Sequence, residues 1–377
     1  MLNPGRGHHH VRVLHIDTEM SWRGGENQIR LLIENAQNSD WQWYLAAPPE
    51  SQAIERMKCI ARPLPVPMRG LAQISAARKI ASFCRQNKIQ LIDCQSSRAH
   101  QLGLMIKFLV PELKLVVHRR VDYPPGKSWG NRLKYINPRI DRYIAISSAI
   151  GDVLKTYGVP ASQIAVVRSA VDAGPFQNQD RLAARQSLVQ ELGFKPDVPI
   201  IGNVAYITEQ KGHETLVRAL GILKAKGVAF QAFIAGDGDL REPNEKLAKE
   251  LNLGSGSLAF LGIRKDVPAL LAASDIFALS SNDEGLGTSL LDAVHSGCTL
   301  VGTAVGGIPE IIHHEKTGLI SPARDGESFA RNLETVLLNP TLRKDLASSA
   351  KAFVDEEFSL KKMVEGNLEN YRQLIHG

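Results

Sequence analysis

Short apolar runs alternate with helical segments along this chain of 377 residues, and the alternation constrains the fold more than any other feature. Runs such as Ile200–Val204 and Ile276–Leu279 are too short for a typical helix and lack the polar alternation of a half-exposed strand. Strands buried on both faces are typical of parallel sheets covered by helices. The sequence therefore predicts an α/β fold with doubly wound parallel sheets.

The runs fall into two series. The first predicts strands at Val11–Ile16, Trp43–Ala47, Ile89–Asp93, Leu113–His118, Arg142–Ile146 and Ile164–Val167, with a helix over Leu71–Asn87. The second predicts strands at Ile200–Val204, Gln231–Ala235, Ser257–Leu261, Ile276–Leu279 and Thr299–Gly302, followed by a final helix over Phe358–Ile375. A chain of this length can bury two cores, so we expect one sheet in each of two domains.

The net charge of +6 is unevenly distributed. Residues 1–172 hold 24 Lys and Arg against 13 Asp and Glu (+11), and the remainder holds 21 against 26 (−5). A basic first half suits an anionic acceptor or an anionic membrane surface, and a plain solvated surface is the alternative. Because the basic residues lack interleaved aromatics and a recognisable nucleic-acid module, we do not expect nucleic acid as a partner.

Targeting and redox signals are few. No apolar run approaches the ~20 residues of a membrane-spanning helix, and the first ten residues, which we exclude from fold reasoning, lack the regions of a secretion signal. The four cysteines form no closely spaced pair and are expected to be small core residues in a reducing compartment: Cys59, Cys84, Cys94 and Cys298. We therefore expect a cytoplasmic protein, with peripheral binding to the inner face of the plasma membrane as an option.

The stretch Ser280–Val294 predicts an anion site. Its polar loop follows an expected strand, and Gly285 and Gly287 let the backbone approach a ligand closely. Thr288 or Ser289 can cap the helix that is expected to begin there. A helix start offers unpaired N–H groups and the positive end of the helix dipole, which suit a phosphate.

Two carboxylates flank this expected anion site. Glu284 precedes it, and Asp292 lies eight residues further on, along the helix. One acid on each side suits a ligand that carries hydroxyls at both ends and phosphates between them, such as a nucleotide-sugar. A loop and a helix with two solvated acids is the plainer alternative.

The stretch Glu284-Gly-Leu-Gly-Thr-Ser-Leu-Leu-Asp292-Ala resembles the signature of two acids eight residues apart in the retaining GT-B glycosyltransferases of family 4, the glycosyltransferases group 1. Five further phrases resemble this family: Ala235-Gly-Asp-Gly-Asp-Leu-Arg241, Phe260-Leu-Gly-Ile-Arg264, Asp266-Val-Pro-Ala-Leu-Leu271, Gly306-Gly-Ile-Pro-Glu310 and Lys316-Thr-Gly-Leu319. The resemblance is dense from about Gly202 to Pro322 and thinner in the first half.

The resemblance implies a GT-B fold, in which two Rossmann-like doubly wound domains face each other across a cleft and a C-terminal helix crosses back to the first domain. The implied limits are an acceptor-binding domain at 1–172, a linker at 173–198, a nucleotide-sugar-binding domain at 199–355 and the crossing helix at 356–377. The implied activity is retaining, metal-independent transfer of a hexose from a UDP- or GDP-sugar. The implied acceptor is a glycan or lipid-linked molecule of bacterial surface polysaccharide or lipopolysaccharide assembly, with no cofactor besides the donor.

Lys211 matches the family's diphosphate-binding lysine, whose charge stabilises the departing nucleoside diphosphate. Five residues earlier, where the family usually has an arginine, this chain has Tyr206. Losing a charge-assisted hydrogen bond costs about 1.5–3 kcal/mol. Arg119, Arg120 and Arg264 are the candidates to replace that arginine, and the sequence does not choose among them.

The resemblance assigns roles to further residues. The catalytic candidates are Glu284, His118 and Lys211, with His118 touching the donor sugar. The donor-binding candidates are Gly24, Gly25, Tyr206, Lys211, Arg264, Glu284, Gly285, Leu286, Gly287, Thr288 and Asp292, and those on the acceptor side are Arg98, Arg119 and Arg120. Asp292 stands where the family usually has a glutamate bound to the ribose, and it keeps that side chain's charge.

Three other interpretations bear on function. Asp237-Gly-Asp239 imitates a metal-binding motif of a different glycosyltransferase fold, but its Gly-rich setting after a strand indicates a structural turn, so no metal is expected. A nucleotide-sugar epimerase of the same fold and a non-catalytic partner subunit, the latter suggested by Tyr206 and Asp292, stay open as alternatives. A hydrolase has no support, because the chain lacks a nucleophile-elbow motif.

Overall fold

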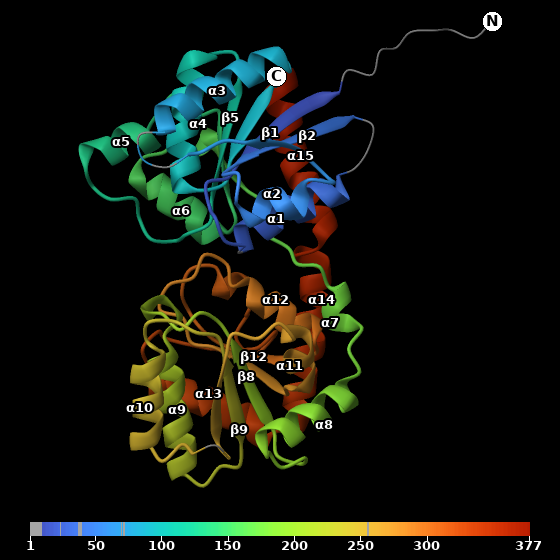
Figure 1. Ribbon diagram of the computed structural model, residues 1–377. Coiled ribbons are helices and arrows are strands. Elements are labelled where there is room, and N and C mark those ends of the chain that lie inside the picture. Colours follow the sequence, from blue (N-terminus) through green and yellow to red (C-terminus); the bar gives the residue numbers. More distant parts are fainter. Residues whose placement is uncertain (1–9, 23, 37–39, 69, 71, 255) are drawn as a thin grey trace, which may run out of the picture. The chain divides into compact units, whose positions relative to one another are not determined.

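The computed structural model describes residues 10–22, 24–36, 40–68, 70, 72–254 and 256–377, and the chain divides into two compact units (Figure 1). Unit 1 comprises the chain up to Ser169 together with Leu360–Gly377, and unit 2 comprises Ala170–Ser359. The segment 173–198, expected to be a linker, contains the helices α7 (Gly174–Gln177) and α8 (Arg181–Leu192). Both helices pack against α11 (Val267–Ala273) within unit 2.

Unit 1 contains a seven-stranded sheet in the order β3-β2-β1-β4-β5-β6-β7, and all of its neighbouring strands are parallel. The strands are β1 (Val11–Ile16), β2 (Trp41–Ala47), β3 (Arg62–Pro65), β4 (Leu91–Cys94), β5 (Lys114–Arg119), β6 (Arg142–Ala145) and β7 (Ile164–Val166). The helices are α1 (Gly24–Asn35), α2 (Gln52–Met57), α3 (Ala72–Gln86), α4 (Ser97–Leu109), α5 (Trp129–Tyr135), α6 (Ser148–Tyr157), the 3₁₀ turn η1 (Ala161–Gln163) and α15 (Leu360–His376). The helices lie on both faces of the sheet, so its strands other than the edge strands β3 and β7 are buried (Figure 1).

Unit 2 contains a six-stranded parallel sheet in the order β10-β9-β8-β11-β12-β13. The strands are β8 (Ile200–Val204), β9 (Gln231–Ala235), β10 (Leu258–Gly262), β11 (Ile276–Leu279), β12 (Thr299–Thr303) and β13 (Leu319–Ser321). The helices besides α7, α8 and α11 are η2 (Glu209–Lys211), α9 (His213–Ala225), α10 (Arg241–Glu250), α12 (Thr288–His295), η3 (Ile308–Glu310), α13 (Gly326–Leu338) and α14 (Pro340–Glu357). An apolar core between the sheet and α9, α13 and α14 includes Val217, Phe329 and Leu346.

Every predicted strand is present within about two residues of its predicted limits, which confirms the α/β prediction. The helix predicted over Leu71–Asn87 is α3, and Leu71 itself lies outside the described residues. The sequence did not predict β3 and β13. β3 is an edge strand whose sequence is Arg-Pro-Leu-Pro, and proline is typical of edges but weakens a strand prediction. β13 has only three residues, too few for a pattern.

The strand order reverses direction once in each sheet, between β1 and β4 in unit 1 and between β8 and β11 in unit 2. Loops leave two such strands on opposite faces of the sheet, so a crevice opens beyond their carboxyl ends. The loops after β1, β4, β8 and β11 are therefore where ligand-binding residues are expected.

The last helix, α15, belongs to unit 1, as the GT-B resemblance predicts. Its fully buried Tyr371 donates a hydrogen bond to the Asp93 carboxylate at the end of β4. His15 Nδ1 and His118 Nε2 lie 3.4 and 3.1 Å from the same carboxylate oxygen, Asp93 Oδ2. Burial opposes ionisation of Asp93, but the two imidazoles outweigh it and hold its pKa below the usual range. One buried carboxylate thus joins the end of the chain to three strands.

The cysteine prediction is correct for three of four residues. Cys84, Cys94 and Cys298 are buried, and burial raises the pKa of the Cys84 and Cys298 thiols to about 12. The prediction is wrong for Cys59, which is exposed just beyond α2. Among the helices of the described residues, none combines the length and apolarity needed to cross a bilayer.

Replacing Tyr371 with phenylalanine tests the link between α15 and the sheet. Tyr371→Phe leaves a buried carboxylate short of one donor, so we expect a loss of about 1–3 kcal/mol in the free energy of unfolding, measured by urea denaturation. Tyr157→Phe is the matched control, because its hydroxyl donates to the Gly126 carbonyl in an exposed setting. Equal losses in the two variants would contradict a special contribution of the buried cluster.

Candidate active site

The loops that follow β8 and β11 bring two predicted residues together. Lys211 ends the 3₁₀ turn after β8, and Glu284 lies in the loop after β11. Lys211 Nζ lies 2.5 Å from Glu284 Oε2, and the side chains are 26% and 12% exposed. Ser281 Oγ also donates to Glu284 Oε2, over 3.3 Å. The strand reversal thus places a cation and a carboxylate side by side, each still reachable from solvent.

Gly212 explains why these two loops lie so close. Its φ is +58°, and a Cβ at this position would lie 2.1 Å from the carbonyl oxygen of Ser280, so only glycine fits. Ser280 Oγ donates to the Gly212 carbonyl over 2.9 Å, and the Asn282 N–H donates to the Gln210 carbonyl over 2.7 Å. These contacts fix the position of Lys211 relative to the loop that carries Glu284.

The helix α12 begins directly after this loop. Its N-cap is Gly287, with φ 87° and ψ 54°, and no side chain accepts a hydrogen bond from the first turn. The prediction that Thr288 or Ser289 caps the helix is wrong, because Thr288 is already the first helical residue and a helix N-cap precedes it. The N–H groups of the first turn are left without a side-chain acceptor and so can bind an anion.

The glycines before α12 are fixed by a neighbouring loop. The Gly307 N–H donates to the Glu284 carbonyl over 3.1 Å, and a Cβ at Gly307 would lie 2.6 Å from the Gly285 carbonyl oxygen. Leu286 is 1% exposed, so its side chain packs inward and only its backbone is left to contact a ligand. The segment Glu284–Gly287 is therefore a rigid backbone surface.

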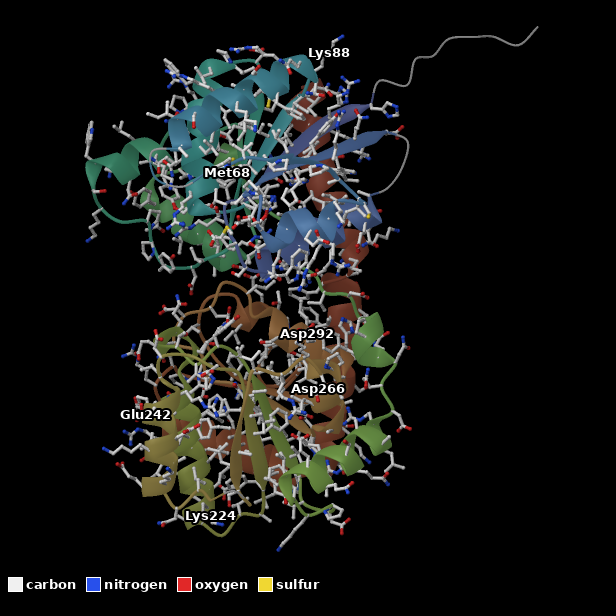
Figure 2. All side chains as sticks on the ribbon, viewed as in Figure 1. Met68, Lys88, Lys224, Glu242, Asp266 and Asp292 are labelled. Atoms are coloured by element: carbon white, nitrogen blue, oxygen red, sulfur yellow. The ribbon has the colours of Figure 1, made fainter. Side chains whose placement is uncertain are left out.

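Asp292 lies on α12, at the opposite end of unit 2 from Lys224 (Figure 2). Among the described residues, its carboxylate makes no hydrogen bond and no ion pair, and desolvation raises its pKa from 3.8 to about 7. Asp292 is half-buried, and partial burial of a carboxylate without donors costs free energy. Hydroxyl groups of a ligand would supply the missing donors.

Two other predicted donor-binding residues of unit 2 lie in different settings. Tyr206 follows β8 and is 59% exposed. The Arg264 guanidinium is held by two carboxylates, at 2.6–2.8 Å from Asp266 and 2.5–3.1 Å from Glu191. These hydrogen bonds raise the pKa of Arg264 above its usual value. Tyr206 can meet a ligand as it stands, whereas Arg264 would first have to leave its two partners.

In unit 1, the predicted glycines lie at the start of α1, after β1. Gly24 has open space where a side chain would be, and a Cβ at Gly25 would lie 3.6 Å from Arg120 Nε. Arg120 Nη2 donates to Gln95 Oε1 over 2.7 Å, and Arg120 Nε has no hydrogen-bond partner in the described structure. A guanidinium whose Nε–H is unpaired thus lies against Gly25.

The other predicted residues of unit 1 are placed as follows. His118 is 5% exposed beside Asp93, and burial lowers its pKa. Arg119 is buried, donates to the Tyr135 hydroxyl and the Tyr123 carbonyl, and lies over both rings. Arg98 is exposed in the first turn of α4. Arg119 therefore serves packing, while Arg98 remains open to a partner.

The predicted turn at Asp237 follows β9. Gly236 and Gly238 have φ values of 151° and 158°, and Asp237 Oδ1 accepts a hydrogen bond of 2.9 Å from the Gly238 N–H. Asp237-Gly-Asp239 thus forms the predicted Gly-rich turn after β9. Within the described ranges, no group of three or more His, Cys, Asp or Glu side chains is placed to hold a metal ion.

Two family models match this chain. The model described as Glycosyltransferase Family 4 matches residues 22–174, and the model described as Glycosyl transferases group 1 matches residues 184–353. The chain belongs to the group 1 glycosyltransferases. The first match lies in unit 1 apart from its last residues, and the second lies in unit 2.

Relatives and solved structures agree with this membership. This glycosyltransferase is 26% identical, over 79% of its length and 80% of the relative's, to the lipopolysaccharide core biosynthesis glycosyltransferase LpsE of Rhizobium meliloti (strain 1021). It is 27% identical to the N-acetyl-alpha-D-glucosaminyl L-malate synthase of Bacillus anthracis, over 63% of its own length and 61% of the relative's. The crystal structure of Anabaena HepE in complex with UDP is similar with a TM-score of 0.84 and 20% identity, over 96% of this chain and all of that one. The fold is GT-B.

Sequence reasoning missed the buried cluster around Asp93 in this glycosyltransferase. His15 and Asp93 are direct neighbours in the register of β1 and β4, and His118 lies on β5, the next strand. Each of these three polar residues interrupts an apolar strand. With the strand order assumed, that pattern could have predicted that they lie side by side. Tyr371 could not be found in this way, because its contact spans 278 positions of the sequence.

The pH dependence of stability distinguishes the two aspartates that Figure 2 labels in unit 2. The folded-state pKa of Asp292, about 7, exceeds its ordinary 3.8, so the cost of the ionised form is absent at low pH and complete above pH 7. Asp292→Asn should therefore raise the Tm at pH 8 by at least about 2 °C, with a smaller effect at pH 5. Thermal scans at both pH values measure this.

Asp266→Asn is the control with the opposite sign. Hydrogen bonds from Arg264 lower the pKa of Asp266, so its stabilising effect is present at neutral pH and is lost as the pH falls through the folded-state pKa. This variant should lower the Tm at pH 8. A Tm that falls at pH 8 in both variants would contradict the uncompensated charge assigned to Asp292.

Proposed function

We propose that this glycosyltransferase transfers a hexose from a UDP-sugar, with retention of anomeric configuration and without a metal ion. The proposed acceptor is an anionic or lipid-linked glycan of bacterial surface-polysaccharide or lipopolysaccharide assembly. The observation that carries the proposal is the Lys211–Glu284 pair, 2.5 Å apart, in the loops at the strand reversal of unit 2. The UDP complex of HepE supports the choice of UDP, and the name of LpsE supports the acceptor class.

Binding of the donor would separate the two partners of this pair. The Lys211 ammonium would move to a diphosphate oxygen, and the Glu284 carboxylate would accept hydrogen bonds from sugar hydroxyls. The exposure of both side chains, 26% and 12%, gives a ligand access to them. When the bond between sugar and phosphate breaks, negative charge grows on the departing UDP, and a fixed ammonium beside it lowers the barrier.

Backbone N–H groups would share the diphosphate charge with Lys211. The first turn of α12 has no side-chain acceptor, and its dipole favours an anion. Gly24 and Gly25 offer a similar helix start in unit 1. Within unit 2, the N–H groups of α12 and the Lys211 ammonium would supply a positive field of the kind that a metal ion supplies in other transferases, which is the basis for proposing a metal-free reaction.

Arg120 is our candidate for the arginine that Tyr206 replaces. Arg119 is fixed by two tyrosines, and Arg264 is held by two carboxylates. In the described structure Arg120 makes a single hydrogen bond, to Gln95, and it lies against Gly25. It therefore keeps N–H groups available for a phosphate oxygen.

Asp292 would accept hydrogen bonds from the ribose hydroxyls. Its carboxylate has no donor in the described structure, and desolvation raises its pKa. Ribose hydroxyls would satisfy it, so the ionised form, present above about pH 7, should bind the nucleotide best. Asp292 would thereby keep the role that a glutamate usually has in this family, with a side chain one methylene shorter.

His118 would approach the donor sugar through Nδ1. Its Nε2 lies 3.1 Å from Asp93 Oδ2, and Nδ1, which is buried, has neither a hydrogen-bond nor an ion-pair partner in the described structure. The adjoining cavity of about 10 Å³, lined also by Arg120 and Gln95, has room for about one water molecule.

On the acceptor side, the exposed Arg98 is the candidate residue to bind an anionic group of the acceptor. The basic first half of the chain suits peripheral binding to an anionic membrane.

Removing the Lys211 ammonium tests the proposed activity. Incubating the enzyme with UDP-glucose or UDP-galactose, a lipopolysaccharide-type acceptor and EDTA should give an α-linked product from the α-linked donor, assigned by NMR. Lys211→Ala should lower kcat by about 10²–10³. Lys226→Ala, which breaks a Lys–Glu pair of 2.6 Å elsewhere in unit 2, is the matched control and should leave kcat unchanged.

Other outcomes point to other functions. A β-linked product would contradict retention, and activity that EDTA abolishes would contradict the metal-free proposal. A new sugar isomer formed without acceptor would indicate an epimerase. A folded protein that binds no nucleotide would indicate a non-catalytic partner subunit, as the Tyr206 and Asp292 replacements suggest.

A pair of arginine variants tests the role of Arg120. Arg120→Gln should weaken UDP binding by about 10- to 100-fold, because a charge-assisted hydrogen bond is worth about 1.5–3 kcal/mol. Arg264→Gln should leave the Kd for UDP within about twofold, since its partners are Glu191 and Asp266. Isothermal titration calorimetry measures both. The reverse order of effects would assign the diphosphate contact to Arg264.

A further inference from the structure

An apolar groove lies between α3 and α4 of unit 1, two helices that pack side by side (Figure 1). We call it the α3–α4 groove; its volume is about 370 Å³, and it is lined by Ile74, Ala77, Arg78, Leu104, Met105, Phe108, Leu109, Asn137 and Arg139. Ile74 is 56% exposed and Phe108 is 68% exposed. Large apolar side chains that are this exposed, within one groove, mark an interaction surface.

Two arginines and no acidic side chain line this groove. Residues 72–139, which contain α3, α4 and α5, hold 13 Lys and Arg against three Asp and Glu. Arg139 lies over the Phe108 ring, with 5.6 Å from its Cζ to the ring centroid. The exposed Arg78 lies on α3 and also lines the groove. Of the three acids, Asp93 is buried, and none lines the groove.

A second pair of exposed apolar side chains lies on α5, the helix that precedes Asn137 and Arg139 in the sequence. Asn137, which lines it, donates from Nδ2 to the Leu133 carbonyl on α5, and Leu133 is 54% exposed. Trp129, at the start of the same helix, is 74% exposed. Tryptophan beside cationic residues is typical of the membrane–water interface, where the ring lies at the level of the headgroups.

We propose that the α3–α4 groove docks onto an anionic lipid bilayer, with Ile74 and Phe108 entering the acyl boundary and Arg78 and Arg139 binding lipid phosphates. The inference deepens the proposed function by naming the surface that would hold the enzyme beside a lipid-linked acceptor. Apolar burial and attraction to anionic lipids act together in such binding. The long arginine side chains can cover apolar surface while their charged ends stay at the headgroups.

The charge pattern favours a bilayer over a protein partner. A protein partner would need acidic side chains spaced to match Arg78 and Arg139, whereas a bilayer presents phosphates at every position. The groove offers a single neutral polar side chain, Asn137, so it has little means of specific hydrogen bonding. Dispersed cations around an apolar centre match a surface of repeated anions.

Vesicle sedimentation tests the proposal. The full chain should sediment with vesicles of phosphatidylglycerol and phosphatidylcholine (1:1) and stay in the supernatant with phosphatidylcholine alone, and raising NaCl from 0.05 to 0.5 M should weaken binding. Arg78→Gln with Arg139→Gln should weaken binding about 25-fold, at about fivefold for each cation. Phe108→Ser should weaken it about tenfold.

Matched variants in unit 2 serve as controls. Leu338→Ser removes an apolar side chain that is 67% exposed, against 68% for Phe108. Arg331→Gln with Lys351→Gln removes two exposed cations and changes the net charge by the same amount as the groove variant. Both controls should bind vesicles like the wild type. Equal losses in groove and control variants, or no binding to phosphatidylglycerol vesicles, would overturn the proposal.

Two further measurements separate this proposal from its alternatives. If light scattering shows a dimer that Phe108→Ser converts to a monomer, while vesicle binding is unchanged, the groove joins two copies of this chain and the proposal is overturned. UDP binding in solution should be the same in groove variants and wild type. If the wild-type protein binds these vesicles but does not bind UDP, the docking surface is supported and the proposed transferase activity is contradicted.

Discussion

The contact between Gly212 and the Ser280 carbonyl is the constraint on which the candidate site of unit 2 depends. A side chain at position 212 would lie 2.1 Å from that oxygen, so only glycine allows the loops after β8 and β11 to meet. Their meeting brings Lys211 to 2.5 Å from Glu284, in front of a helix whose first turn has no side-chain cap. The order of the strands determines which loops are adjacent, and one glycine determines how closely they approach.

Unit 1 depends on a different kind of interaction, a buried carboxylate. Asp93 lies among two histidines and Tyr371, and the last helix of the chain is thereby joined to the central strands of a sheet formed by the first half. Such a cluster specifies the position of α15 because an unpaired buried carboxylate would be costly. It also holds His118 at the end of β5, next to Arg120 and Gln95. The same polar group thus supports the fold and orients a candidate site residue.

The sequence predicted what local patterns determine and missed what depends on distant contacts. Apolar runs located β8 and β11 because buried parallel strands need no partner to be recognised, whereas β3 has prolines and β13 has three residues. Glu284 was predicted from its place before the expected anion site and Lys211 from the family resemblance, and the structure brings them together. The sequence could not predict which of Arg119, Arg120 and Arg264 keeps N–H groups for a ligand. Their partners lie on other elements, such as Glu191 on α8 for Arg264. The helix α3 was predicted, but the exposure of Phe108 on α4 was not.

The central claim is that the carboxyl edge of unit 2 binds the nucleotide-sugar, with Lys211 exchanging Glu284 for a phosphate. A crystal structure of the protein with UDP tests it most directly. We expect the diphosphate within hydrogen-bond distance of Lys211 Nζ and the first turn of α12, the ribose hydroxyls on Asp292, and a broken Lys211–Glu284 pair. UDP bound away from α12, for example in the hollow lined by Arg218, Asn244 and Arg324, with the Lys211–Glu284 pair intact, would contradict the account.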